Sequence, residues 1–341
     1  MSRTTTISLG AAFALTIAVF PSGCRAFQDA MLSHILRNQA KLQSYRGVLV
    51  ERGLVPEGDL KSDIAFARPD RVLVRALSPE IYKGSTILAA DGNVTLYWPQ
   101  FNYAIRVDHL PQPDAEGQRR LVTDAYRHDL ATYDVDIGDS GHASGHPTVA
   151  LTYTAKRPDT LQRKSTFSVY DKFSIPVAGE MHFAGGADYA FHYDSIDFNQ
   201  PVDDATFQLN LPPATLITHW DLDGPNVPPA DAKAQANFPL TLPDPPDGLL
   251  QTRVVRVDGP LPAYTVVYRS DPHYLLLTEY KDLGIRLAAA EIGVPLTVGK
   301  HQGKLLLAPL SSTYTFRENG VVYQVFGNVP FEDLLAFAGR L

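Results

Sequence analysis

The chain has 341 residues, 45% of them hydrophobic and 10% aromatic, so it can bury a sizeable core, and its length favours two domains. Its formal net charge of −7 argues against a nucleic acid partner, and it has no polybasic cluster for an anionic membrane. The sequence contains no Walker motif, no dinucleotide-binding glycine fingerprint and no zinc-ligand spacing, so neither a cofactor nor a metal ion is expected.

Residues 1–23 have the pattern of a secretory signal peptide. The apolar run from Ile7 to Phe20 ends at Pro21 and is shorter than the roughly 20 residues that a membrane-spanning helix needs. The sequence PSGC that ends at Cys24 resembles a bacterial lipobox, although a lipobox more often has Leu in place of Pro21. We expect Cys24 to be acylated; the alternative is an ordinary signal peptide that is cut nearby, with Cys24 incidental.

Cys24 is the only cysteine, so it has no disulfide partner in the oxidising compartment outside the cytoplasm. Acylation would explain why a single thiol occurs at this position. If Cys24 is acylated, the Arg25 that follows it resembles the arrangement that does not hold a lipoprotein at the inner membrane. The expected product is exported and attached to a membrane through its N-terminal lipid, at the outer membrane and facing the periplasm.

An amphipathic helix is predicted within residues 25–45, because apolar side chains recur there at helical spacing. The pattern then changes to short extended segments. Val72 and Val74 alternate with Arg71 and Arg75, which is the period of an antiparallel strand with one solvated face. Strands are predicted in this part at residues 47–54, 60–69, 70–77, 85–92, 93–99 and 103–110.

Turn signals separate these strands, as in the hairpin sequence Asp91-Gly92. About eleven strands and few helices indicate a mainly β (α+β) fold over residues 24–220. We expect a large curved antiparallel sheet, a half-barrel, whose concave face a single helix covers or leaves open. The later predicted strands are residues 147–155, 163–171, 175–184, 188–199 and 205–212.

The stretch 137–146 is rich in Gly and Ser and is predicted to be a loop between strands. It contains Ser140, but a nucleophilic serine needs a base held by a third group and an oxyanion site, so no enzyme is expected. His142 and His146 would converge on a metal only in a helix, which the neighbouring glycines disfavour. The acidic pair at 203–204 is interpreted as turn chemistry rather than as a calcium site.

Residues 221–247 are rich in proline, which removes backbone donors and disfavours a long helix or a central strand, so this segment is predicted to be a linker. The remaining residues 248–341 are predicted to form a small α+β C-terminal domain. Segments 262–282 and 312–341 carry strand patterns around an Asn319-Gly320 turn, and a short helix ends the chain.

Four features of the first domain occur together: the leading helix, the segment FARPDRVLVR at 66–75, the segment at 87–107, and a strand, turn and strand at 193–213. In this order they resemble the bacterial lipoprotein-carrier superfamily, which includes LolA, LolB and the N-terminal domain of RseB. The resemblance covers roughly residues 26–220 and is a pattern of spacing rather than a catalytic signature. Residues 312–341, in which a strand ending near GNVP precedes a helix, are similar to the C-terminal domain of RseB-like regulators.

The resemblance implies an apolar cavity that holds acyl chains, or a lipidated polypeptide, without covalent chemistry. Burial of each methylene there would contribute about 0.8 kcal/mol. For every candidate residue the alternative is ordinary core packing, and the aromatic cluster at 97–103 is either the rim of the cavity or a packed hairpin. The cavity candidates are Phe66, Val72, Val74, Leu96, Trp98, Phe101, Tyr103, Ile105, Phe167, Val169, Phe183, Phe191 and Tyr193.

Three functions follow from this resemblance. The first is a non-enzymatic envelope lipoprotein that takes part in lipoprotein or lipid trafficking or reception, which a membrane anchor at Cys24 favours. The second is a sensor similar to RseB that binds an envelope protein and regulates a transmembrane anti-sigma factor, which the two-domain layout favours. The third is a structural scaffold with a filled cavity and no ligand.

Overall fold

Two β-sheets make up most of the protein in the computed structural model, which describes residues 25–284, 291–308 and 311–341. The predicted signal peptide and Cys24 lie outside the described residues. The fold is mostly β, with 51% strand and 17% helix, so the predicted fold class is confirmed.

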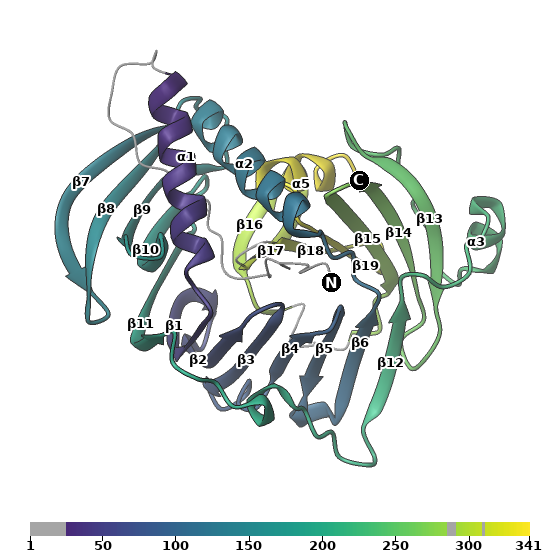
Figure 1. The fold of residues 1–341 in the computed structure, drawn as a ribbon. Coiled ribbons are helices and arrows are strands. Elements are labelled where there is room, and N and C mark those ends of the chain that lie inside the picture. Colours follow the sequence, from purple (N-terminus) through teal and green to yellow (C-terminus); the bar gives the residue numbers. More distant parts are fainter. Residues whose placement is uncertain (1–24, 285–290, 309–310) are drawn as a thin grey trace, which may run out of the picture.

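The first sheet has twelve strands in the order β12-β6-β5-β4-β3-β2-β1-β11-β10-β9-β8-β7. Neighbouring strands are antiparallel, except that β12 runs parallel to β6. The sheet is open and strongly curved (Figure 1). Its strands are β1 Ser44–Val55, β2 Gly58–Ala67, β3 Arg71–Ser78, β4 Thr86–Ala90, β5 Asn93–Trp98, β6 Tyr103–Asp108, β7 Tyr133–Ala143, β8 His146–Ala155, β9 Gln162–Tyr170, β10 Ile175–Phe183, β11 Asp188–Phe198 and β12 Leu216–Asp221.

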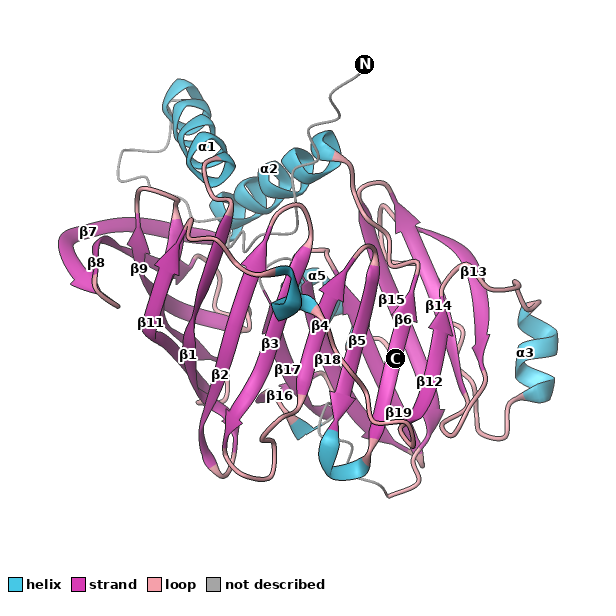
Figure 2. Cartoon of the chain, turned by 60° about the horizontal axis from the view of Figure 1, so that its bottom comes forward, coloured by secondary structure: helices cyan, strands magenta, loops and turns pink. Residues whose placement is uncertain are grey.

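Two helices, not one, cross one end of this sheet (Figure 2). Helix α1, Arg25–Ala40, lies where the sequence predicts a helix. Helix α2, Ala115–Thr132, was not predicted; the side chain of Asp114 caps it by accepting the Gly117 N–H at 2.8 Å. The two helices pack together through Ile35 of α1 and a buried patch of α2.

Two further local predictions were wrong. The stretch 137–146 is not a loop but the end of the β7–β8 hairpin, whose turn is Ser144-Gly145. Both turn residues have positive φ, 51° and 78°, as a tight two-residue hairpin turn requires. Residues 205–212 do not form a strand: the short 3-10 helix η2, Asp204–Phe207, occupies part of this segment and places Phe207 against the sheet.

The second sheet has seven strands in the order β13-β14-β15-β19-β18-β17-β16. The predicted Asn319-Gly320 turn joins β18 to β19, and the predicted C-terminal helix is α5, Phe331–Ala338. Phe337 of α5 packs against Tyr268 with ring centroids 5.4 Å apart. The strands are β13 Leu250–Val257, β14 Ala263–Ser270, β15 His273–Lys281, β16 Val294–Val298, β17 His301–Ala308, β18 Ser311–Glu318 and β19 Val321–Gly327.

The proline-rich segment between the sheets contains one short helix, α3, Pro229–Gln235, and no strand. Two hydrogen bonds connect this segment to the second sheet. The backbone N–H of Thr241 donates to the Glu279 carboxylate at 2.8 Å, and the Tyr268 hydroxyl donates to the carbonyl of Pro243 at 2.8 Å. Glu279 is fully buried beneath this segment.

The second sheet lies on the concave side of the first, opposite β2 to β6 (Figures 1 and 2). The N–H of Gly293, just before β16, donates to the carbonyl of Leu54 in β1 at 2.9 Å. Burial raises the pKa of Tyr280 in β15; Arg317 lowers it, and the neighbouring Tyr103 of β6 raises it, so Tyr280 lies close to the first sheet. One buried apolar cluster contains residues of both sheets.

Candidate functional site

The concave side of the first sheet, here called the inner face, carries most of the predicted cavity residues. Side chains of directly paired residues point to the same side of a sheet. The pairing places Val74 beside Ile87, Ile87 beside Leu96, and Leu96 beside Ile105. A second row runs alongside, in which Phe66 pairs with Val72.

The other half of the sheet continues the inner face. Phe191 pairs with Gly179, and Gly179 pairs with Phe167. A Cβ at Gly179 would lie 2.4 Å from the Phe167 ring and 2.9 Å from the Phe191 ring, so this position requires glycine for close packing. Tyr193 pairs with Leu49. Register and alternation also put Trp98, Tyr103, Val169 and Phe183 on this face.

Phe101 is the exception among the thirteen candidates. It lies in η1, Pro99–Phe101, between β5 and β6, and is 47% exposed. Behind it, Trp98 and Tyr103 stack with ring centroids 6.0 Å apart, and the Tyr103 hydroxyl bonds to Thr218 at 2.8 Å. Trp98 and Tyr103 are thus packed in this hairpin, and Phe101 is exposed at its tip.

Burial divides the inner face into a packed part and a partly exposed part. Eight candidates are buried: Phe66, Trp98, Tyr103, Ile105, Phe167, Val169, Phe183 and Phe191. Val72, Val74, Leu96 and Tyr193 are only partly buried. The sequence reasoning missed Ile87, which is 36% exposed on the same face although its alternation in TILAA was visible.

On the outward side of β3, Leu73 is more deeply buried than the inward-pointing valines on either side of it. Leu73, between Val72 and Val74, is 2% exposed and packs with Ala65 and Phe207 of η2 on the outer side. Strand β3 therefore buries the outward Leu73 more completely than the inward Val72 and Val74, which is unusual for a sheet with a packed concave side. Val72, Val74, Ile87 and Leu96 are named the apolar track below.

The second sheet presents apolar groups toward the same interior. Leu306 of β17, Thr313 of β18, Phe326 of β19 and Leu276 of β15 form one cross-strand row. This row lies on the same side of its sheet as Tyr280, which is a neighbour of Tyr103 in β6. Leu306 and Phe326 are only partly buried. Apolar surface that is not fully packed thus exists on both sheets.

Hydrogen bonds connect the C-terminal end of helix α1 to two turns of the first sheet. The Asn38 amide donates to the carbonyl of Asp171, in the β9–β10 turn, at 2.8 Å. Arg68 of the β2–β3 turn donates to the carbonyls of Gln39, at 2.9 Å, and Leu42. Earlier along α1, Ile35 packs against α2 rather than against a strand.

Two histidine–carboxylate pairs connect helix α2 to helix α5 and to the second sheet. His128 of α2 lies 3.1 Å from Glu332 of α5, and Asp124 of α2 lies 3.1 Å from His273 of β15. The Tyr133 hydroxyl also donates to Glu332. These contacts join the helices over the end of the first sheet to the second sheet.

The pair of His128 and Glu332 predicts a pH dependence. Burial alone would lower the pKa of His128, but the hydrogen bond to Glu332 and nearby carboxylates outweigh it and raise the pKa. A raised folded-state pKa adds stability that is complete below the unfolded pKa and lost as the pH rises through the folded pKa. We expect the His128 ring to titrate above 6.5 by NMR, and Glu332→Gln to move its pKa downward. An unchanged pKa in Glu332→Gln would contradict the pairing.

The serine, histidine and aspartate candidates for catalysis and metal binding lie in strands and turns, where they are exposed or make structural contacts. Ser140 and His142 are exposed on β7. His146 stacks on Tyr170, with centroids 4.6 Å apart, and its Nε2 bonds to the carbonyl of Ile196 at 3.0 Å. Asp203 caps η2 by accepting the Ala205 N–H, as turn chemistry predicts. Among the described residues, no group of three or more His, Cys, Asp or Glu side chains is arranged to hold a metal.

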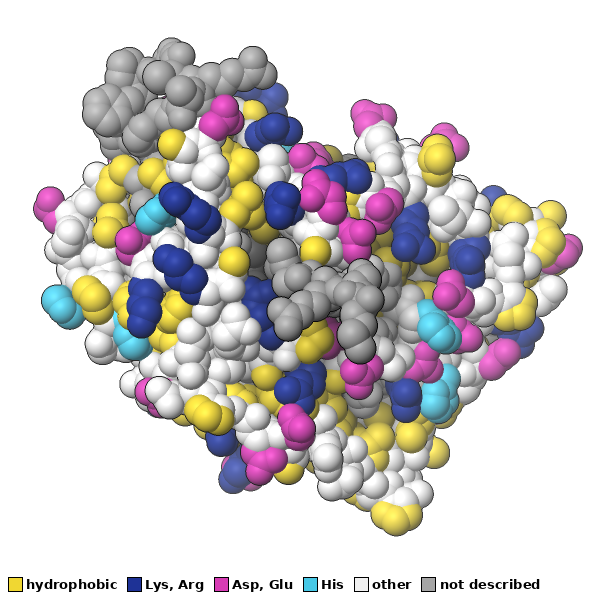
Figure 3. All heavy atoms as spheres, viewed as in Figure 1, with side chains coloured by type: hydrophobic (Ala, Val, Ile, Leu, Met, Phe, Trp, Pro, Cys, Tyr) yellow, Lys and Arg dark blue, Asp and Glu magenta, His cyan; other side chains and the backbone are white. Residues whose placement is uncertain are grey.

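Charge is mixed on the surface. Figure 3 shows Lys and Arg interspersed with Asp and Glu on the side that carries the helices. Within the ranges that the structure covers, no helix has both the length and the apolarity to cross a membrane.

Comparison with solved structures gives matches at low identity. MucB of Pseudomonas aeruginosa, solved with MucA, is 12% identical over 92% of this chain and 97% of that one, with a TM-score of 0.45. A LolA-superfamily protein from Nitrosomonas europaea matches 53% of this chain and 97% of its own, at 13% identity and a TM-score of 0.30. The lipoprotein LppX of Mycobacterium tuberculosis matches 53% and 99%, at 13% and 0.35.

These matches include the superfamily that the sequence resembles. No family model and no curated protein matches the chain.

Proposed function

We propose that this protein binds acyl chains, carried by a lipid or by a lipidated polypeptide, on the inner face of the first sheet and without catalysis. The observation that supports this most directly is the apolar track. Its side chains point into the molecule, yet they are more exposed than Leu73, which points outward. Partly exposed Leu306 and Phe326 on the facing sheet supply a second apolar wall.

The apolar track is part of a longer apolar row on the inner face, and the length of this row suits an extended chain. The row from Ile64 through Val74, Ile87 and Leu96 to Ile105 crosses five neighbouring strands. At about 4.8 Å between strands, this row is roughly 19 Å long. Each methylene buried there contributes about 0.8 kcal/mol, so about ten methylenes would contribute on the order of 8 kcal/mol before the costs of association.

The test is native mass spectrometry of the Cys24→Ala protein, purified gently from the cell envelope, with extraction of any bound lipid. We expect a co-purified or added acyl ligand at a defined stoichiometry. A protein that stays free of ligand, and that also refuses added fatty acids and acylated peptides, would contradict the proposal and favour the scaffold.

A second candidate function is a sensor, in which occupation of the inner face alters contacts with an envelope protein. The observation that favours it is that α2 contacts α1 on one side and the second sheet on the other, through His128 and Asp124. A ligand that displaced the helices would change these contacts, which is the coupling that a sensor needs.

Hydrogen exchange of the full chain with and without an acyl ligand separates the two functions. A sensor is expected to change protection in α5 and at the start of β15, far from the apolar track. A carrier or receptor is expected to change protection only along the inner face and in α1. The control is the exposed end of β7, which neither function involves.

The membrane anchor is a separate proposal that rests on the sequence. If Cys24 is acylated, the wild-type mature protein will fractionate with membranes and carry the additional mass of its acyl groups. We expect Cys24→Ala to remove that mass and to release the protein into the soluble fraction. A variant that stays membrane-associated, with its mass otherwise unchanged, would contradict lipidation at this residue.

A further inference from the structure

Glu51 places a carboxyl group on the inner face of the first sheet. It pairs with Leu60 of β2 and with Phe191 of β11, one of the inner-face residues. The other two charged residues of β1, Arg46 and Arg52, have the opposite parity in the strand and point outward. Glu51 is only 9% exposed. A carboxylate buried this deeply is costly without hydrogen-bond partners, so its place on an apolar face needs a physical reason.

Two tyrosines of β11 flank Glu51. In an antiparallel pair, the residues diagonally opposite a position lie within reach of long side chains, and for Glu51 these are Tyr189 and Tyr193. The Tyr189 hydroxyl donates to Glu51 Oε1 at 2.8 Å. Burial, and then the neighbouring Tyr45 and Glu51, raise the pKa of Tyr193 well above its ordinary value. Glu51 and Tyr193 are therefore neighbours, as the register indicates. Glu51, Tyr189 and Tyr193 are here called the polar cluster.

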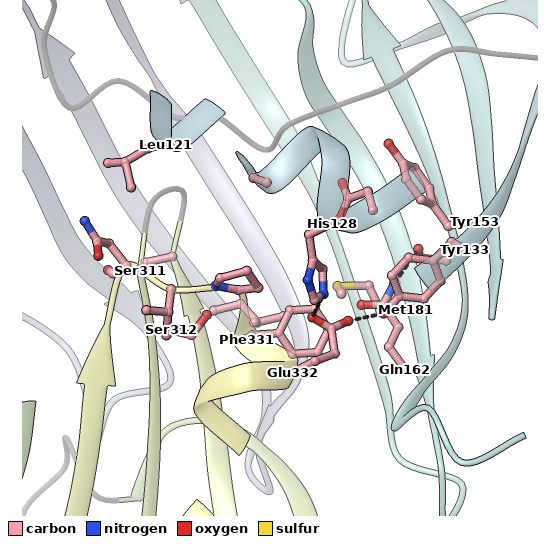
Figure 4. A pocket seen from close by; sticks show the side chains of 18 of the residues that line it. Leu121, His128, Tyr133, Tyr153, Gln162, Met181, Ser311, Ser312, Phe331 and Glu332 are labelled. Carbon is pink, nitrogen blue, oxygen red and sulfur yellow. Dashed lines mark hydrogen bonds and ion pairs between the residues drawn. The ribbon is translucent and has the colours of Figure 1, made fainter. Parts of the chain in front are cut away.

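The polar cluster has hydrogen-bonding capacity that the protein does not use. Within the described residues, Glu51 Oε2 and the Tyr193 hydroxyl make no hydrogen bond, and both keep some accessible surface. Glu332 differs, because its carboxylate accepts from both Tyr133 and His128 (Figure 4). It lines a separate pocket of about 160 Å³ between α2, β7 to β10 and the second sheet. A ligand donor thus finds a free acceptor at Glu51 but not at Glu332.

The protonation of the polar cluster decides which ligand groups it can bind. Burial raises the pKa of Glu51 to about 7, although the hydrogen bond from Tyr189 lowers it. At pH 8 most of this carboxyl group is therefore ionised and can only accept hydrogen bonds. The Tyr193 hydroxyl keeps its proton at that pH and can donate. The cluster then offers one acceptor and one donor on neighbouring side chains of an apolar face.

We propose that the polar cluster binds the secondary amide of an N-acyl group, and that Glu51 selects this amide over an ester. The amide N–H donates to Glu51 Oε2, and the amide carbonyl accepts from the Tyr193 hydroxyl. An ester has the carbonyl but no N–H, so it leaves the buried carboxylate without its second partner. Tyr189 is a positioning residue, because its hydrogen bond orients the Glu51 carboxylate.

The inference rests on the proposed acyl binding by the inner face, because the acyl chain supplies the apolar contacts. The polar cluster lies on the same face as the apolar row. Leu60, the β2 partner of Glu51, is four residues from Ile64, where that row begins, which is roughly 13 Å along the strand. An amide at the cluster therefore lies beside the surface proposed for its acyl chain.

The first experiment titrates the full chain at pH 8, by calorimetry, with N-ethyl lauramide, N-ethyl-N-methyl lauramide and ethyl laurate. All three probes are uncharged and share one acyl chain, but only the first has an N–H. We expect the first to bind at least tenfold more tightly than either of the others. Equal affinities would overturn the amide site and leave acyl binding intact. Failure of all three to bind would contradict the proposed function itself.

The variants of the cluster assign the preference to its residues. Glu51→Leu combined with Tyr189→Phe removes the carboxylate and its donor together, which leaves no orphaned polar group. We expect this double variant to bind the amide and the ester equally. Glu51→Gln, which keeps the shape of the side chain, is expected to reduce the preference at least threefold. Tyr193→Phe is expected to weaken the amide and the ester alike, because both use the carbonyl. An unchanged preference in the double variant and in Glu51→Gln, with circular dichroism unchanged, would overturn the assignment.

Two further variants serve as controls of position. Glu180 is an exposed carboxyl group of β10 that pairs with Ala190 and Thr166 on the outer side, so Glu180→Gln is expected to keep the full preference. Glu332→Gln changes the carboxylate of the separate pocket and is also expected to keep it. A preference that Glu332→Gln removes and the double variant retains would place the amide in that pocket and overturn the proposal.

A final pair of probes distinguishes the source of the amide. N-lauroyl ethanolamine carries the amide on a lipid headgroup, whereas N-lauroyl glycylglycinamide carries it on an uncharged peptide. Tighter binding of the first assigns a lipid, and tighter binding of the second assigns an acylated polypeptide. Binding of neither more tightly than ethyl laurate would overturn the amide chemistry.

Discussion

Replacing Ile87 with Glu is expected to lower the affinity for an acyl ligand at least a hundredfold. Ile87 lies at the middle of the apolar track, between Val74 and Leu96. An ionised carboxylate there must either lose its water against the acyl chain or exclude the chain from the face, and either costs several kcal/mol. A hundredfold loss corresponds to about 2.7 kcal/mol, which is within that cost.

The chain offers a matched control for this variant. Ile217 on β12 is 37% exposed, almost the same as Ile87 at 36%, but it pairs with Ala104 on the outer side of the sheet. Ile217→Glu is therefore expected to bind acyl ligands as the wild type does. Titration with a fluorescent fatty acid measures both affinities, and circular dichroism checks both folds. Equal loss in the two variants, or no loss in either, would contradict a site on the inner face.

The second large effect concerns stability. Glu279 is fully buried, with Oε1 lacking a hydrogen-bond partner, and burial raises its pKa to about 8. The unfolded chain releases this proton near pH 4.5, whereas the folded chain keeps it until about pH 8. Between these values the folded state binds more protons, so stability falls as the pH rises. The cost at pH 7 is on the order of 3 kcal/mol.

Glu279→Gln is expected to remove most of this cost, because an amide has the shape of the protonated acid and can accept the Thr241 N–H. Urea unfolding at pH 5 and pH 8 measures the effect. We expect the variant to resemble the wild type at pH 5 and to be more stable at pH 8, by on the order of 3 kcal/mol. A variant that is less stable at both pH values would show that Glu279 is held ionised by its surroundings.

The strands of the first sheet were predictable where alternation and turn chemistry agreed. Val72 and Val74 alternate with charged neighbours, and Asp91-Gly92 adopts the positive φ values that a tight hairpin turn needs. Helix α2 was not predicted because its buried side chains, such as Leu121, Val122 and Tyr126, form only a narrow stripe among charged residues. The Gly and Ser content of 137–146 indicated a loop, although this stretch forms the end of the β7–β8 hairpin.

The candidate site was predictable only in part. The strand register places the cavity candidates that lie on strands on one face of the sheet, because period 2 fixes which side each side chain points to; that they line a cavity stays a prediction. Alternation could not distinguish Phe66, which is buried, from Val74, which is partly exposed, because this depends on what lies opposite. The second sheet, which lies opposite this face, is formed by residues that are distant from it in the sequence. The same is true of Phe207, which covers Leu73 on the outer side. Cys24 and its acylation stay a prediction.

Photoaffinity labelling tests the central claim most directly. The full chain with Cys24→Ala is incubated with a fatty acid that carries a diazirine near its methyl end, irradiated, digested and analysed by mass spectrometry. The inner-face proposal predicts labels in β3, β4 and β5, at or next to Val74, Ile87 and Leu96, and their loss on competition with unlabelled fatty acid. Labels confined to outward-facing apolar side chains such as Phe101 and Ile217, or labels that no competitor removes, would contradict it.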